Sequence, residues 1–311
     1  MKKIVLLLAV FALLIAGATS ASAGNPPSGE FSIEEITFEN AGDTVYATFT
    51  TPDGVRGNMP AVLMLHGFTG DRNEGPVLQP DFTFDDFMYE RTANQFAMNG
   101  IATLRIDFRG SGESVDMIGF EETTFSGQIS DAYAAVEWLD DHRGIGDIGV
   151  LGLSQGGLVG AITAESHKRV SSLVLWSPVA NPVDTYKTVL GSDCVAEGLA
   201  AASATCTLPW GVDVTLNQPF FEELYTTDPI AAISHYDKPL QVVVGERDDI
   251  VTPQPQYGET YMTYHDGYEE LVVLDGDHVF DVFTGNGAPA LDEAIGESLD
   301  WFNETLRHRS W

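Results

Sequence analysis

The feature of this 311-residue chain that most restricts its fold is a series of short apolar runs separated by helical patterns. The runs that follow Pro60 cover residues 61–65, 101–108, 148–153, 172–176, 240–244 and 271–274. Short, continuous apolar runs are typical of strands that are buried on both faces of a parallel sheet. Between them, residues such as Ile129, Tyr133 and Val136 share one helical face. Strands that alternate with helices predict an α/β fold, with a mainly parallel central sheet and helices on both faces.

Two parts of the chain depart from this alternation. Before Pro60, the stretches Phe31–Phe38 and Thr44–Thr50 are predicted to be strands joined by a turn. The interval Val179–Tyr236 contains both cysteines, several prolines and no obvious strand, so it is interpreted as an insertion at about 179–236. The predicted organisation is therefore one domain over residues 24–311 with a small insertion.

The N-terminus has the pattern of an export signal. A basic start, Met1–Lys3, precedes the apolar run Ile4–Ala18, and Ala21–Ala23 has the small-residue pattern of a cleavage site. The run is shorter than the roughly 20 apolar residues that a membrane-spanning helix needs. We predict a signal peptide over residues 1–23, a secreted or periplasmic protein, and no stable membrane anchor after cleavage.

The charge and the cysteines restrict the partners and the chemistry. The 46 acidic residues exceed the 15 basic ones and give a net charge of −31, which argues against nucleic acid as a partner. Two cysteines exclude a four-cysteine zinc module and a scaffold built from disulfides. In an exported protein, Cys194 and Cys206 are predicted to form a disulfide inside the insertion.

The segment Gly152–Gly156 matches the G-x-S-x-G nucleophile elbow, with Ser154 at its centre. An apolar strand precedes it and a helix that begins with small residues follows it. This context fits an elbow, because the strained turn needs glycines around the serine. The free N–H groups at the start of the helix would then point at a developing negative charge.

A serine nucleophile needs a base, and the base needs an acid that orients it. In the elbow fold the acid comes next along the chain and the histidine last. Asp248 follows the run 240–244, and His278 follows the last run in a glycine-containing loop. Asp248 and His278 are therefore the predicted acid and base, with Asp249 as an open alternative for the acid.

The negative oxygen of an acyl-transfer intermediate needs two backbone donors. One predicted donor is the N–H of Gln155, which follows the nucleophile. The other is the N–H of Phe68, in the loop His66–Gly70 after the run 61–65. His66 itself is interpreted as a structural histidine rather than a base.

Together these motifs resemble the α/β-hydrolase superfamily, and within it the feruloyl or cinnamoyl esterase-like group. The resemblance rests on His66–Gly70, Ala102–Asp107 with Gly110–Ser114, the Ser154 elbow, Gly245–Pro253 and His278, in family order over about residues 61–302. It implies a triad of Ser154, Asp248 and His278, no metal and no cofactor. It also implies a cap after the sixth strand, which fits Val179–Tyr236; the cysteine pair in that cap is not a family feature.

The predicted function is that of a secreted serine hydrolase that cleaves small-molecule carboxylic esters through an acyl-enzyme, with feruloyl or cinnamoyl esters as candidate substrates. An acylglycerol lipase, a peptidase and a thioesterase are alternatives on the same fold. A catalytically inactive binding protein on a hydrolase scaffold is the alternative that is not an enzyme. The residues leave the natural ester and the oligomeric state open.

Overall fold

The structure is a computed structural model that describes residues 29–55, 57–78, 87–116 and 118–307. The predicted signal peptide, residues 1–23, lies outside the described residues. Within the described ranges, no helix combines the length and the apolar character that crossing a membrane requires.

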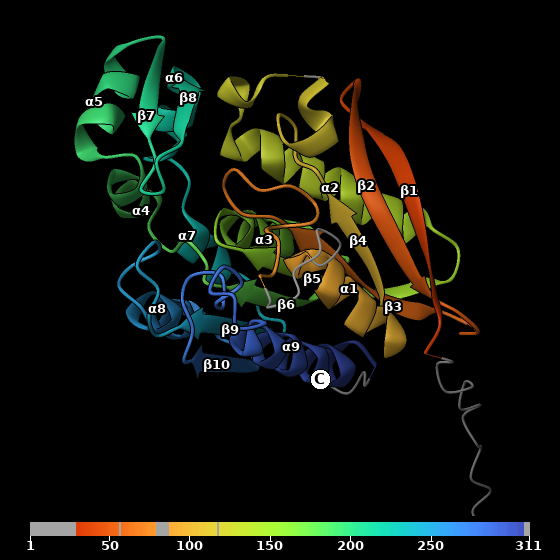
Figure 1. Cartoon of the computed structure of the whole chain (residues 1–311). Helices are drawn as coiled ribbons and strands as arrows, with labels where there is room; N and C mark the ends of the chain where they lie inside the picture. The colour runs from red at the N-terminus through yellow and green to blue at the C-terminus, as the bar shows by residue number, and fades with distance from the viewer. Residues whose placement is uncertain (1–28, 56, 79–86, 117, 308–311) are drawn as a thin grey trace, which may run out of the picture.

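The core of the fold is an eight-stranded sheet in the order β1-β2-β4-β3-β5-β6-β9-β10 (Figure 1). Its strands are β1 (Phe31–Asn40), β2 (Asp43–Pro52), β3 (Met59–Leu65), β4 (Ala102–Ile106), β5 (Ile145–Leu153), β6 (Val170–Trp176), β9 (Leu240–Gly245) and β10 (Glu269–Leu274). The six strands from β4 to β10 in this order are parallel, whereas β2 runs antiparallel to both β1 and β4. Each apolar run of the sequence thus lies in a parallel strand.

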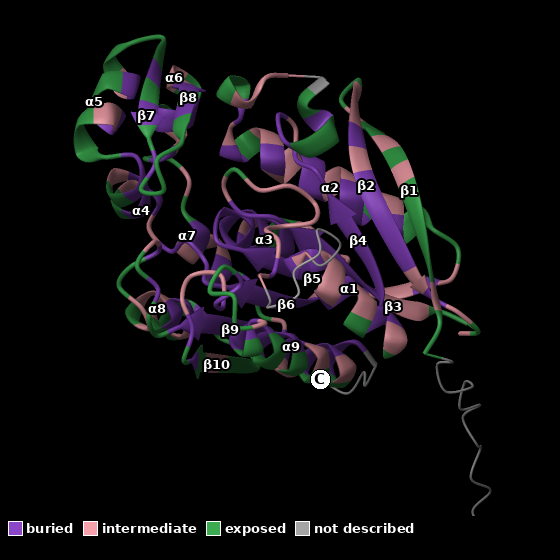
Figure 2. Ribbon diagram, viewed as in Figure 1, coloured by how far each residue is buried: buried purple, intermediate pink, exposed green. Residues whose placement is uncertain are grey.

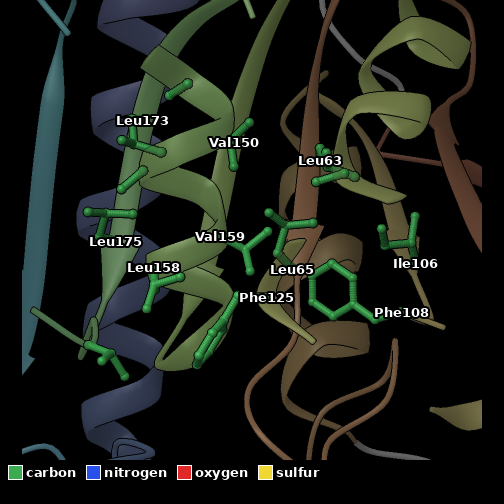
Figure 3. Close-up of a cluster of buried hydrophobic side chains, with 14 of the residues drawn as sticks. Leu63, Leu65, Ile106, Phe108, Phe125, Val150, Leu158, Val159, Leu173 and Leu175 are labelled. Atoms are coloured by element: carbon green, nitrogen blue, oxygen red, sulfur yellow. The ribbon is translucent and has the colours of Figure 1, made fainter. Parts of the chain in front are cut away.

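Side chains of a strand alternate between the two faces of its sheet. Because the central strands are apolar throughout, both faces are apolar, and helices cover both. Ala61, Leu63 and Leu65 of β3 join the core beneath α2 (Phe125–Asp141) and α3 (Gln155–Ser166), which Figure 3 shows in part. Val62 and Met64 point the other way. The helices on that second face are α1 (Met88–Met98) and α9 (Pro289–Arg307), while α8 (Gln256–Tyr264) adds to the first.

Burial follows this layering. Figure 2 shows buried residues concentrated along the central strands, whereas the edge strand β1 is largely exposed. Two short 3₁₀ turns, Gly112–Asp116 and Phe120–Glu122, connect β4 to α2. The carboxyl ends of the parallel strands therefore meet at one edge of a rigid sheet, which is where such folds place their sites.

The segment between β6 and β9 contains α4 (Pro182–Val189), α5 (Ser192–Ala200), β7 (Ser203–Thr207), β8 (Asp213–Asn217), α6 (Gln218–Glu223) and α7 (Pro229–Ile233). Much of this segment projects from the central sheet, with α5, β7, β8 and α6 at the upper left of Figure 1, whereas its last helix, α7, packs against α3. The segment contributes no strand to the central sheet, but it contains a hairpin that the sequence did not reveal, because β7 and β8 pair with each other as antiparallel strands. Each strand has five residues, many of them small or polar, which leaves too short an alternation to recognise in the sequence.

The Cys194–Cys206 disulfide expected from the sequence is present and joins α5 to β7. The two cysteines are 12 positions apart in the sequence, so the bond closes a short loop. In the same segment, a Cβ atom on Gly198 would lie 2.2 Å from the Phe221 ring, so α5 packs closely against α6. The disulfide thus ties β7 of the hairpin to α5, and α5 in turn packs closely against α6.

Candidate active site

Ser154 lies in the sharp turn between β5 and α3. Its φ of 56° and ψ of −115° are a strained conformation for a residue with a side chain. The Ser154 N–H donates to the carbonyl of Trp176 on β6 at 2.8 Å, and the N–H of Leu158 donates to the Ser154 carbonyl at 3.2 Å. Backbone contacts on both sides therefore hold the serine in this conformation.

The glycines of the elbow are required by the close approach of three backbone segments. A Cβ atom on Gly152 would lie 2.2 Å from the carbonyl oxygen of Gly156, and one on Gly156 would lie 2.0 Å from that of Leu65. Neither neighbour is a flexible side chain, so the turn cannot accept a larger residue at either position. The spacing recognised in the sequence thus has a steric cause.

Asp248 and His278 are hydrogen-bonded to each other, although 30 residues separate them. The Nδ1 atom of His278 lies 2.8 Å from Oδ2 of Asp248. The other carboxylate oxygen accepts the N–H groups of Ile250 and Val251, both at 2.9 Å, and the Asp248 side chain is fully buried. A carboxylate with these partners can orient the imidazole and stabilise its charged form.

A glycine also allows the two loops that carry Asp248 and His278 to meet. A Cβ atom on Gly245, at the end of β9, would lie 2.4 Å from the carbonyl oxygens of Gly276 and Asp277. The Arg247 N–H donates to the Gly276 carbonyl at 3.0 Å and so ties the loops together. Asp249 does not take part in this pairing, and its side chain lines the neighbouring cavity instead.

The predicted oxyanion donors lie on either side of Ser154. Gln155 is the first residue of α3, so its N–H has no acceptor within the helix. Its side chain is buried and bonded to Gln128 and Tyr186, which fixes the start of the helix. Phe68 lies in the loop after β3 and packs edge-on against Tyr186, with ring centroids 5.3 Å apart.

His66 supports the loop that carries Phe68. The Nδ1 atom of His66 lies 2.8 Å from the carbonyl of Gly67, and its Nε2 atom accepts the N–H of Phe108 at 3.2 Å. Burial lowers the pKa of His66, which favours the neutral ring that these two bonds require. His66 is therefore bonded to backbone on both nitrogens and is not available as a base.

A cavity of about 490 Å³ lies in front of these groups. Ser154, His278 and Phe68 all contribute to its wall. The segment between β6 and β9 supplies much of the rest, including Tyr186 and Trp210. The described residues contain no group of three His, Cys, Asp or Glu side chains arranged to hold a metal ion.

Several cavity residues were not identified from the sequence, among them Trp210, Phe283 and Glu74. Trp210 is half exposed at the end of the β7–β8 hairpin, and Phe283, in the loop before α9, is 52% exposed. Glu74 lies in the loop after β3, where burial raises the pKa of its carboxyl group to about 7. An acidic residue a few positions after His66–Gly70 was a visible signal for Glu74, whereas nothing local marks the two aromatic residues.

Comparisons with known proteins relate the chain to serine hydrolases by partial sequence similarity. A family model described as serine aminopeptidase, S33 matches residues 87–230, a range that includes Ser154 and ends before Asp248. The esterase EstD of Thermotoga maritima is 26% identical over 245 residues, which cover 72% of this chain and 54% of EstD. The chain spans about half the length of the curated relatives it matches.

Solved structures establish the fold. Est1E from Butyrivibrio proteoclasticus with ferulic acid bound matches with a TM-score of 0.72 and 20% identity, over 88% of this chain and 100% of Est1E. The α/β hydrolase GrgF from a Penicillium species matches with a TM-score of 0.68 and 16% identity, over 89% of this chain and 100% of GrgF. The chain has the α/β-hydrolase fold. The predicted fold class is thereby confirmed, and the predicted resemblance is confirmed at the level of the fold, which the chain shares with Est1E.

Proposed function

We propose that this α/β hydrolase is a serine esterase that cleaves small-molecule carboxylic esters through an acyl-enzyme intermediate. One observation carries the proposal: Ser154 and His278 line the same cavity, and His278 is bonded to the buried carboxylate of Asp248. An activated serine requires such a base and such an orienting acid. The proposed triad is therefore Ser154, His278 and Asp248.

In the proposed reaction, Ser154 Oγ attacks the ester carbonyl while Nε2 of His278 accepts the hydroxyl proton. The imidazolium returns that proton to the leaving alcohol, and the acyl group stays bonded to Ser154. Water then attacks the acyl-enzyme while His278 accepts one of its protons. The bond between the acyl carbon and Ser154 Oγ breaks, His278 returns the proton to Ser154 Oγ, and the carboxylic acid leaves. Asp248 stabilises the imidazolium in both halves of the cycle, since it bonds the opposite ring nitrogen.

The N–H groups of Gln155 and Phe68 are the proposed donors to the negative oxygen of each tetrahedral intermediate. The first belongs to the N-terminus of α3, where the helix dipole adds positive potential. Each donor of this kind lowers the barrier by roughly 3 kcal/mol in serine hydrolases. Both proposed donors are backbone groups, one at the start of α3 and one in the loop after β3.

Feruloyl or cinnamoyl esters are the proposed substrate class. The cavity wall contains Phe68, Tyr186, Trp210 and Phe283, which suit a flat aromatic acyl group. The solved Est1E structure with ferulic acid bound supports the same class by analogy of fold. A peptidase is the second candidate, because the matching family model is described as a serine aminopeptidase.

Export completes the proposal. The predicted signal peptide at residues 1–23 places the mature protein in an oxidising compartment, in which the Cys194–Cys206 disulfide is stable. Mass spectrometry of the protein purified from its native host tests this point. A mature N-terminus near Gly24 is expected. An exported protein that still begins at Met1 contradicts cleavage of this signal.

The activity itself is tested with a substrate panel and a covalent probe. Fluorophosphonate is expected to label wild-type protein at Ser154, and the Ser154→Ala variant should remain unlabelled. The panel contains methyl ferulate, an aryl acetate, a long-chain aryl ester and an aminoacyl anilide. The highest kcat/KM is expected for ferulate; preference for the anilide supports the peptidase, and absence of both labelling and hydrolysis contradicts the enzyme.

Reduction of the Cys194–Cys206 disulfide is expected to raise KM for methyl ferulate more than for an aryl acetate. The bond anchors β7, and the hairpin that β7 begins carries Trp210 to the cavity wall. Loss of the crosslink also increases the entropy of the unfolded chain and so lowers the free energy of unfolding by about 3 kcal/mol. KM values of wild type and of Cys194→Ser/Cys206→Ser test this role, which unchanged values for both esters contradict.

A further inference from the structure

The peptide between Gly67 and Phe68 is held by a set of bonds that the proposed chemistry has not yet used. Its carbonyl accepts from His66 Nδ1 at 2.8 Å and from the Gly70 N–H at 3.2 Å. In a trans peptide the carbonyl and the N–H point in opposite directions. The bonds to the Gly67 carbonyl therefore set the direction of the Phe68 N–H.

Glu74 holds the preceding peptide of the same loop. The Oε2 atom of Glu74 accepts the Gly67 N–H at 2.6 Å. The N–H groups of Asn73 and Glu74 both donate to the Asp71 side chain, which forms a turn. The Glu74 N–H donates to the Asp71 carbonyl at 3.0 Å, so the glutamate is itself fixed. Both peptides that flank Gly67 are thus restrained, one by His66 and one by Glu74.

The carboxyl group of Glu74 fills the inside of this loop. A Cβ atom on Gly70 would lie 2.7 and 2.9 Å from its two oxygens, so the loop closes around the carboxyl group. A Cβ atom on Gly67 would lie 3.6 Å from both Glu74 Oε2 and Ser154 Cβ. Gly67 thus lies between the Glu74 carboxyl group and Ser154, and Glu74 and Ser154 line the same cavity.

The charged and titratable groups around Glu74 come from several elements. Asp71 lies in the same loop, Tyr89 on α1, and His278 in the loop after β10. Asp249 and Asp277 line the cavity that Glu74 faces. Burial and, to a smaller extent, Asp71 raise the pKa of Glu74, whereas the Gly67 N–H and a charged His278 lower it, and together they bring it to about 7. Glu74 therefore gains or loses its proton near neutral pH.

We propose that Glu74 is a positioning residue. By fixing the His66–Gly67 peptide it keeps Gly67, and with it the following Phe68 N–H, in the orientation needed for the oxyanion, and its charge acts on His278 in the same cavity. This inference rests on the proposed esterase function. The bond to Gly67 needs an acceptor oxygen and not a charge, whereas the influence on His278 needs the charge. The two effects can therefore be separated by substitution.

The Glu74→Ala variant removes both effects, and Glu74→Gln keeps the acceptor but removes the charge. With an aryl acetate, kcat of Glu74→Ala is expected to fall by roughly 10- to 100-fold, part of the loss seen when an oxyanion donor is removed. Its KM should change little, because the loop bond acts on the transition state. Glu74→Gln should recover most of the lost kcat.

The charge is tested by the pH dependence of kcat/KM. A carboxylate at Glu74 favours positive charge on His278, because opposite charges in one cavity attract, and the proposed reaction needs the neutral ring to accept the serine proton. In Glu74→Gln the acid limb is expected to move to lower pH by a few tenths of a unit. The control is Asp292→Asn, which removes one exposed carboxylate paired with Arg91 outside the cavity and should leave the profile unchanged.

Infrared titration gives a readout that does not depend on hydrolysis. A carboxyl proton that titrates near pH 7 is expected in wild type and in Ser154→Ala, and it should be absent from Glu74→Gln. If Glu74→Ala does not fold, Glu74→Gln and Asp292→Asn still decide the effect of charge.

The outcomes separate the two proposals. An active wild type with unchanged kcat in Glu74→Ala, or a Glu74→Gln variant as slow as Glu74→Ala, overturns the role of Glu74 alone. A wild type that hydrolyses no ester overturns the proposed function together with the role that rests on it.

Discussion

Replacement of Ser154 by alanine is expected to lower kcat for ester hydrolysis by about 10⁶-fold, and His278→Ala should lower it by a similar factor. Serine and histidine act as one unit in acyl transfer, so the loss of either removes nearly the whole contribution of the pair. The fold should survive Ser154→Ala, because the change deletes one oxygen of a residue at the cavity wall. Steady-state kinetics on an aryl acetate measure the loss.

Melting temperature is the control for both variants. Values within a few degrees of wild type would assign the loss to chemistry rather than to unfolding. The wild-type kcat/KM should also fall at acidic pH, because a protonated His278 cannot accept the serine proton. A folded Ser154→Ala protein that keeps a substantial part of the wild-type rate would contradict the proposed nucleophile.

Asp248→Asn is expected to cost roughly 10³- to 10⁴-fold in kcat, whereas Asp249→Asn should stay within a few-fold of wild type. An asparagine at position 248 can still accept the N–H groups of Ile250 and Val251 through its oxygen. Its NH₂ group would then face Nδ1 of His278 and favour the ring tautomer that cannot accept the serine proton. The large expected loss therefore comes from the tautomer and not from a broken loop.

The Asp249→Asn variant is the matched control, since it makes the same chemical change one position away. Asp249 lines the cavity but does not bond to His278. Its replacement changes the charge near the substrate and should appear mainly in KM for charged esters. A larger loss of kcat in Asp249→Asn than in Asp248→Asn would overturn the assignment of the acid.

The sheet could be predicted because its determinants are local. A run such as 148–153 is short, apolar and followed by a helical pattern, and these properties are sufficient to recognise a buried parallel strand. The β7–β8 hairpin escaped recognition because its five-residue strands owe their form to the packing of the surrounding segment.

The elbow could also be predicted, because its conformation depends on neighbours in sequence. Gly152 is required by the backbone of Gly156 within the turn itself, and Gly156 by the carbonyl of Leu65 on the neighbouring strand β3, and the spacing around Ser154 reflects both. Cys194 and Cys206 could be paired for a similar reason, since they are close in sequence and the only cysteines of the chain.

The sequence by itself determined the order of strands and helices, the position of Ser154 in a tight turn, and the candidates Asp248, Asp249 and His278. Only the tertiary structure decided which aspartate bonds to His278, because that bond depends on the contact of two loops 30 residues apart. The tertiary structure also placed Glu74 beside Ser154 and Trp210 at the cavity wall. Such contacts between distant segments follow from how the layers pack, and no local pattern of residues encodes them.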